Sequence, residues 1–149
     1  NSTGGTLANQ PFGDIATTAN HYGIQALVRP TSKISLSGWA GYSDATAQAG
    51  PNEGADAEMF YRAAALALRD LGAKGSTLGV IFGQPPRVTD NDIAAREDED
   101  TSYHLEALYK LPINDNIVIT PGVLVIFNPE HNNDNDTIYV GTLRTTFKF

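Results

Sequence analysis

The stretch SYHLEALYKL, residues 102–111, decides the fold class of this chain. Its apolar side chains recur at every second position, and the positions between them are mostly polar. The apolar set is Tyr103, Leu105, Ala107, Tyr109 and Leu111. Because successive side chains of a β-strand point to opposite faces of the sheet, this period of two predicts a strand with one apolar face and one polar face.

The same alternation recurs on both sides of this stretch and predicts further strands. Residues 116–128 and 139–149 continue it toward the C-terminus, where Phe147 and Phe149 share the apolar face while Arg144 and Lys148 share the other. Residues 21–29, 34–42 and 77–83 show shorter alternations. The chain is therefore predicted to be all-β, with antiparallel strands in an up-and-down meander.

Residues 57–70, AEMFYRAAALALRD, form the one ambiguous segment. Their Ala and Leu content favours a helix by intrinsic propensity. The turn GAKG at residues 72–75 and the strand pattern that follows it favour a hairpin instead. We predict a strand here, which makes seven strands in all.

Composition excludes several classes of protein. No run approaches the ~20 apolar residues that a membrane-spanning helix needs. The chain has no cysteine, which excludes disulfides, thiolate metal sites and a cysteine nucleophile. The net charge of −7 argues against binding to nucleic acid, which needs clustered Lys and Arg. No GxSxG, P-loop, GxGxxG or HExxH motif is present, so we expect neither an enzyme nor a bound cofactor.

Short and long connections alternate along the chain. Short turns are expected at residues 30–33, 71–75 and 112–115, and long loops at 44–56, 85–100 and 129–136. In a meander this places the short turns at one end of the sheet and the long loops at the other. Such an asymmetry is typical of bacterial outer-membrane barrels.

A membrane-spanning sheet must close into a barrel, because lipid cannot satisfy the amides of a free edge. Single-chain bacterial barrels have even strand numbers, so seven strands predict that residues 1–149 are the C-terminal portion of a larger transmembrane barrel. Strands outside this segment would then close it. The alternative is a soluble β-sandwich that binds carbohydrate through its tyrosines and Trp39.

Three stretches carry a resemblance to a known family. Residues 119–149, ITPGVLVIFNPEHNNDNDTIYVGTLRTTFKF, resemble the C-terminal end of cyanobacterial outer-membrane porins, and LGVIFGQPP and TSYHLEALYKLPINDNIVITPG resemble upstream parts of the same family. This family is related to the carbohydrate-selective porins and is often described as iron-uptake porins. Its members tend to have an aromatic or apolar residue where Arg62 lies, which leaves the facing of residues 57–70 open.

The resemblance implies a passive channel in the outer membrane, in contact with membrane lipid and lipopolysaccharide. It also implies a homotrimer and attachment to the cell wall through an N-terminal domain that nothing in this chain matches. The terminal TTFKF, residues 145–149, is similar to the signal read by the barrel-assembly machinery. The solutes expected for such a channel are inorganic ions, iron species or small sugars.

A porin needs a wet lumen whose fixed charges sort solutes, so its functional residues face inward. We expect Arg144 and Glu106 near the constriction, either as lumen charges or as an ion pair that braces the wall. The other expected pore-lining residues are His104, Lys110, Lys148, Gln25, Arg29, Lys33, Ser35 and Ser37.

Two of the expected loops are rich in acid and amide side chains. They are DNDIAAREDEDT, residues 90–101, and NPEHNNDND, residues 128–136. Such oxygen-rich loops could hold Ca²⁺, but neither has the ligand spacing of an EF-hand. We expect solvated external loops that concentrate cations at the channel mouth.

Overall fold

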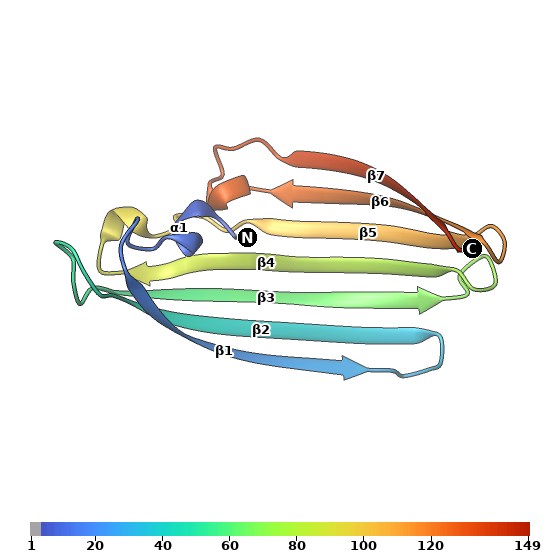
Figure 1. The fold of residues 1–149 in the computed structure, drawn as a ribbon, viewed down its shortest axis with the longest axis horizontal. Coiled ribbons are helices and arrows are strands. Elements are labelled where there is room, and N and C mark those ends of the chain that lie inside the picture. Colours follow the sequence, from blue (N-terminus) through green and yellow to red (C-terminus); the bar gives the residue numbers. More distant parts are fainter. Residues whose placement is uncertain (1–3) are drawn as a thin grey trace.

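Seven antiparallel strands form one sheet in a computed structural model that describes residues 4–149. The strands follow one another across the sheet in chain order, so every neighbour in sequence is a neighbour in space (Figure 1). Their bounds are β1 Thr17–Val28, β2 Ile34–Ala47, β3 Asp56–Arg69, β4 Thr77–Asn91, β5 Tyr103–Pro112, β6 Ile117–Phe127 and β7 Ile138–Phe147. The helical elements are α1 (Thr6–Asn9) and two 3-10 turns, η1 (Ala94–Arg96) and η2 (Pro129–His131).

The predicted all-β meander is confirmed, and the ambiguous segment is strand β3. β3 pairs with β2 along one edge and with β4 along the other, so its backbone groups are satisfied within the sheet. This pairing overrides the helix propensity of its Ala and Leu residues. Among residues 4–149, no helix is long and apolar enough to cross a membrane.

β4 is longer than the sequence pattern indicated. The prediction that residues 85–100 form a loop is wrong for residues 85–91, which continue β4. Pro85 and Pro86, which lack a backbone N–H, lie beyond Gly83, where the pairing of β4 with β5 ends. On the other edge, register shifts between Glu58 and Met59 and between Phe60 and Arg62 accommodate them against β3.

One face of the sheet is apolar and uncovered. Successive strands place apolar residues side by side on this face, for example Leu36, Leu66, Val80, Ala107 and Val123. Leu143 is 71% exposed and Phe147 is 65% exposed. No second layer covers this face within residues 4–149, so the described chain is not a β-sandwich. We call it the outer face.

Aromatic rings mark the outer face toward the end with the long loops. Tyr22 stacks on Tyr42 with ring centroids 6.5 Å apart, and Phe82 stacks on Tyr103 at 5.5 Å. Arg62 lies on β3, between the strands that carry these two pairs, and its register partners are Ala40 and Gln84. Ala40 in turn pairs with Ile24, which shares the outer face with Tyr22. The facing that the sequence left open is therefore settled: Arg62 is on the outer face, and Tyr61 and Ala63 are on the opposite one.

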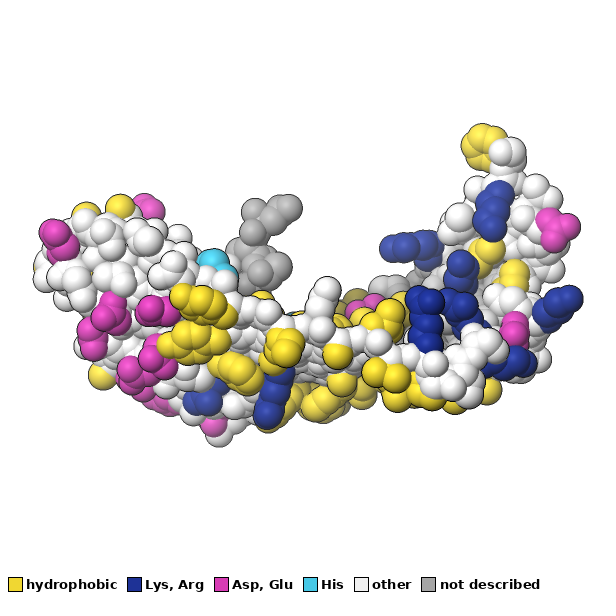
Figure 2. Space-filling view, turned by 90° about the horizontal axis from the view of Figure 1, so that it is seen from below, with side chains coloured by type: hydrophobic (Ala, Val, Ile, Leu, Met, Phe, Trp, Pro, Cys, Tyr) yellow, Lys and Arg dark blue, Asp and Glu magenta, His cyan; other side chains and the backbone are white. Residues whose placement is uncertain are grey.

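The connections segregate as expected. The turns after β1, β3 and β5 are at one end of the sheet, and the longer connections after β2, β4 and β6 are at the other (Figure 1). Viewed from the side, the molecule is a shallow trough, with acidic side chains gathered at the long-loop end and Lys and Arg at the short-turn end (Figure 2). The second face of the sheet, here called the inner face, carries polar, charged and small residues together with larger apolar ones such as Ile81, Leu108 and Leu124.

Candidate functional site: the inner face of the sheet

A row of basic residues crosses the inner face near the short-turn end. Register pairing places Arg69 beside Thr77, Thr77 beside Lys110, and Thr120 beside Arg144. Lys33 joins the row at β2, because its carbonyl accepts a hydrogen bond from the backbone N–H of Arg69 at 2.8 Å. Lys110 and Thr120 are adjacent in the register that β5 and β6 share, so the row reads Lys33, Arg69, Thr77, Lys110, Thr120 and Arg144. We call this set the basic row.

The basic side chains of this row are exposed and nearly free of acidic partners. Within residues 4–149 the one ion pair is between Lys33 Nζ and Asp70 Oδ2, at 3.7 Å. Asp70 lies in the turn after β3, where the N–H of Gly75 and then the charge of Lys33 lower the pKa of its carboxyl. Arg69, Lys110 and Arg144 therefore present uncompensated charge on this face.

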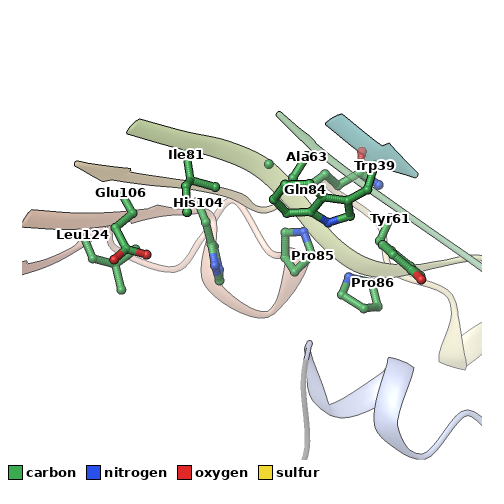
Figure 3. Close-up of a pocket in the computed structure, with 11 residues that line it drawn as sticks. Trp39, Tyr61, Ala63, Ile81, Gln84, Pro85, Pro86, His104, Glu106 and Leu124 are labelled. Atoms are coloured by element: carbon green, nitrogen blue, oxygen red, sulfur yellow. The ribbon is translucent and has the colours of Figure 1, made fainter. Parts of the chain in front are cut away.

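A second feature of the inner face is a hollow of about 290 Å³ toward its middle. Trp39, Tyr61, Pro85 and Pro86 line one side of it, and His104 and Glu106 line the other (Figure 3). Such a mixture of ring faces and hydrogen-bonding groups can accommodate a polar solute that also has apolar patches.

Glycines make room for the aromatic rings of this hollow. A Cβ built on Gly41 would lie within 2.1 Å of the Tyr61 ring, so the ring lies flat on the sheet over Gly41. A Cβ on Gly83 would lie 2.5 Å from the Cβ of Ala63 and 2.9 Å from the carbonyl of Arg62, so β3 and β4 approach closely there. These close contacts explain why glycine occupies both positions within otherwise regular strands.

The N-terminal segment, residues 4–16, folds onto the inner face at the long-loop end. Phe12, which is 5% exposed, packs with Leu7, Ala8 and Ile15 against inner-face residues of three strands. Those strand residues are Ala45, Ala47, Ala57, Met59 and Val88. Hydrogen bonds from Asn91 Nδ2 to the Pro11 carbonyl (3.0 Å) and from Arg96 Nη1 to the Gln10 carbonyl (2.8 Å) fix the segment further. It therefore covers the inner face at this end of the sheet.

Buried polar contacts hold the long loops in place. His131 is 2% exposed; its Nδ1 accepts the backbone N–H of Ser102 at 3.0 Å, and its Nε2–H donates to the Pro86 carbonyl at 2.9 Å. His131 and its neighbour Glu130 both have positive φ, a strained conformation that these contacts stabilise. The loop after β6 is thereby tied to β4 and to the start of β5.

Asp98 makes a comparable contact in the loop after β4. Its Oδ2 accepts the backbone N–H of Val88 at 2.7 Å. Burial raises the pKa of this carboxyl above its usual 3.8, an effect that the Val88 N–H and the charges of His131 and Arg87 oppose. Because the folded-state pKa is raised, the folded state binds this proton more tightly than the unfolded state, and Asp98 contributes stability at low pH that falls as pH rises through the raised pKa.

The predicted pore-lining residues fall on the inner face or at its short-turn end. Gln25 pairs with Trp39, Ser37 pairs with Leu27 and Ala65, and Ser35 pairs with Ala67. Arg29 directly follows β1, and the backbone of Lys148 extends the β7 ladder by bonding to Asn116. Glu106 and Arg144 lie on different rows and are separated by β6, and no ion pair joins them.

The sequence analysis did not identify four residues that shape the inner face and its loops. Arg69 belongs to the basic row, but the uncertain facing of residues 57–70 concealed it. Tyr61 was hidden for the same reason. The inward packing of Phe12 and the loop contacts of His131 depend on residues far apart in the chain, and no local pattern indicates them.

The acidic loops show hydrogen bonding among their own residues and the backbone. Asp100 accepts from the backbone and side chain of Asn133, and Asp92 accepts the backbone N–H of Asp56. Residues 4–149 contain no cluster of three or more His, Asp or Glu placed to hold a metal ion.

These features define a class: an antiparallel up-and-down sheet with an apolar outer face and charged residues on the inner face, which is the pattern typical of strands in transmembrane β-barrels. The comparison with family models agrees, because residues 1–149 match the model of the carbohydrate-selective porin, OprB family. The chain belongs to this family of outer-membrane channel proteins, which are not enzymes.

Two curated cyanobacterial proteins are similar over nearly the whole chain. The uncharacterized protein sll0772 of Synechocystis sp. is 38% identical over 163 residues, covering 99% of this chain and 30% of its own length. The uncharacterized protein alr4550 of Nostoc sp. is 40% identical over 146 residues, covering 98% of this chain and 24% of its own length. The chain thus spans less than a third of either relative. No solved structure matches it.

Proposed function

We propose that this chain forms the C-terminal wall of a larger outer-membrane porin through which small polar solutes and inorganic ions diffuse passively. The observation that carries the proposal is the two-sided character of the sheet. Uncovered apolar side chains on the outer face, such as Leu143 and Phe147, suit contact with lipid, whereas Glu106, Lys110 and Arg144 on the inner face suit water.

The edges of the sheet support the presence of further strands in the functional barrel. Within residues 4–149, β1 and β7 each pair on one side only. A free edge in hydrocarbon would leave a row of amides without partners, which costs several kcal/mol for each group. Strands of the same protein beyond this segment would satisfy both edges, in keeping with the greater length of the relatives.

The outer face suggests which partners surround the barrel. The aromatic pairs Tyr22–Tyr42 and Phe82–Tyr103 are suited to the membrane interface at the long-loop end. There the protein would contact membrane lipid and lipopolysaccharide. We further propose a homotrimer, with attachment to the cell wall through a domain outside this chain.

The inner face suggests how solutes are sorted. The hollow beside Trp39, Tyr61, His104 and Glu106 offers ring faces together with hydrogen-bonding groups, which suits sugars, and the family description names carbohydrates. The charged residues suit ions. We propose that Glu106 and Arg144 line the lumen as separate charges, because they do not pair with each other.

The test is channel formation by the full-length protein. Purified in detergent and added to planar bilayers, it should give stepwise conductance, and liposomes containing it should swell in solutions of small sugars. Reversal potentials in salt gradients, compared between the wild type and Glu106→Gln, report whether this carboxylate faces the permeating ions. A protein that is soluble and monomeric without detergent and gives no conductance would overturn the proposal.

A further inference from the structure

Positive charge is concentrated at one level of the inner face. The basic row places Arg69, Lys110 and Arg144 on β3, β5 and β7, each separated from the next by one strand. Since adjacent strands lie ~4.8 Å apart, successive cations are about 10 Å from each other along the wall. This is close to the Debye length of about 8 Å in physiological salt, so the fields of neighbouring cations overlap.

No acidic side chain of the described strands interrupts this field on the inner face near the row. The row next toward the middle consists of Ser35, Ala67, Gly79, Leu108, Gly122 and Thr142. Glu106, the first inner-face carboxylate, is four residues from Lys110 along β5, or about 13 Å at the rise of an extended strand. Asp70 is engaged with Lys33 at the margin of the row.

Hydroxyl groups alternate with the cations. Thr77 lies between Arg69 and Lys110, and Thr120 lies between Lys110 and Arg144. Guanidinium groups present paired N–H donors that match two oxygens of one anion, and threonine hydroxyls add single donors. This combination recognises the several oxygens of a tetrahedral oxyanion better than it recognises chloride, which has no directional lone-pair pattern.

We propose that the basic row is a binding station for small oxyanions in the channel, with the phosphate group as the recognised chemistry. The phosphate can be inorganic phosphate or part of a sugar phosphate, because both present the same oxygens. The inference rests on the proposed channel and adds a solute class to it. Acidic residues crowd the long-loop end, so the station is reached more easily by anions from the short-turn end (Figure 2).

The experiment measures current block in planar bilayers that contain the full-length channel in potassium chloride. Inorganic phosphate, glucose 6-phosphate and uncharged glucose are added in turn to either side. The variants are Arg144→Gln and the triple variant Arg69→Gln, Lys110→Gln, Arg144→Gln. Arg62→Gln is the matched control, because it removes one positive charge from the same barrel wall on its outer face.

If the basic row binds phosphate, then phosphate should block the wild-type current at a lower concentration when it is added on the short-turn side than when it is added on the long-loop side. The triple variant should need about threefold more phosphate for the same block, as expected for the loss of three charges that act on a divalent anion over about 10 Å in water at physiological salt. Arg62→Gln should behave as the wild type. Block by glucose 6-phosphate but not by inorganic phosphate identifies the sugar phosphate as the solute, and the reverse identifies the free anion.

The inference is overturned if the triple variant and Arg62→Gln are blocked as the wild type is, or if glucose blocks as well as glucose 6-phosphate. A wild-type channel that conducts but is blocked by neither inorganic phosphate nor glucose 6-phosphate from either side also overturns it, without the use of any variant. In all these cases stepwise conductance persists, so the proposed channel stands. Absence of any conductance contradicts the channel itself.

Discussion

Replacing Phe12 by Ala should release the N-terminal segment from the inner face. The Phe12 ring is 5% exposed and is the largest side chain in the cluster that joins this segment to β2, β3 and β4. Truncation of a buried Phe costs about 3–5 kcal/mol, and each 1.4 kcal/mol is a factor of ten in an equilibrium. The ratio of docked to released segment should therefore fall by about 10²- to 4 × 10³-fold.

The remaining contacts do not compensate for this loss. The hydrogen bonds to the Pro11 and Gln10 carbonyls each contribute about 1 kcal/mol, because water replaces them on release. Hydrogen exchange of residues 6–13 should accelerate in the variant, while exchange in β5 and β6 stays slow. Because the segment covers part of the inner face, single-channel conductance should also rise.

Phe12→Leu is the matched control. It keeps most of the apolar volume and should cost less than about 1.5 kcal/mol, so its conductance and exchange should stay close to those of the wild type. If Phe12→Ala shows wild-type protection of residues 6–13 and unchanged conductance, then the segment is held by other contacts and does not narrow the channel.

Three further outcomes follow from particular contacts. Gly83→Ala should lower the free energy of unfolding by about 1–3 kcal/mol, because the new Cβ meets the backbone of β3, whereas Gly141→Ala meets nothing within 4 Å and should be neutral in the same denaturation assay. Arg62→Leu should leave the free energy of unfolding in lipid unchanged or raise it by about 1 kcal/mol, because a charge that faces lipid near the membrane interface costs only about 0–1 kcal/mol. A loss of stability above about 2 kcal/mol would contradict this. His131→Phe should speed hydrogen exchange of the Ser102 amide, because a phenyl ring cannot accept this N–H; exchange at the wild-type rate would contradict this.

The buried contact of Asp98 predicts how the stability of the loop after β4 changes with pH. Protonation of Asp98 favours the folded loop, because burial raises the pKa of this carboxyl in the folded state. Asp98→Asn keeps an acceptor oxygen for the Val88 N–H, so it should leave the loop after β4 folded and remove this pH dependence when unfolding is measured over a range of pH.

Much of the fold could be predicted from the sequence because barrel strands are long and two-sided. The alternation in residues 103–111 spans enough positions to distinguish a strand from a helix, and the same holds for β6 and β7. Boundaries were less accurate where pairing, not composition, extends a strand. β4 runs to Asn91 because β3 continues to pair with it past the two prolines.

β3 shows where local propensity fails. Its Ala and Leu residues favour a helix when considered alone, yet both of its edges are paired in the sheet. Ala63 lies on the inner face beside Trp39, where a small side chain leaves room for the hollow. That reason is visible only when neighbouring strands are in register.

By itself, the sequence determined the fold class, the two faces of most strands and the separation of short turns from long loops, because these depend on side-chain periodicity along single strands. Only the tertiary structure decided which charges act together. Arg69, Lys110 and Arg144 are up to 75 positions apart in the chain, and they form one row because four successive strand pairings, from β3 to β7, fix their register. The inward fold of Phe12 and the buried contacts of His131 also depend on tertiary structure, since each joins segments whose own sequences carry no sign of the partner.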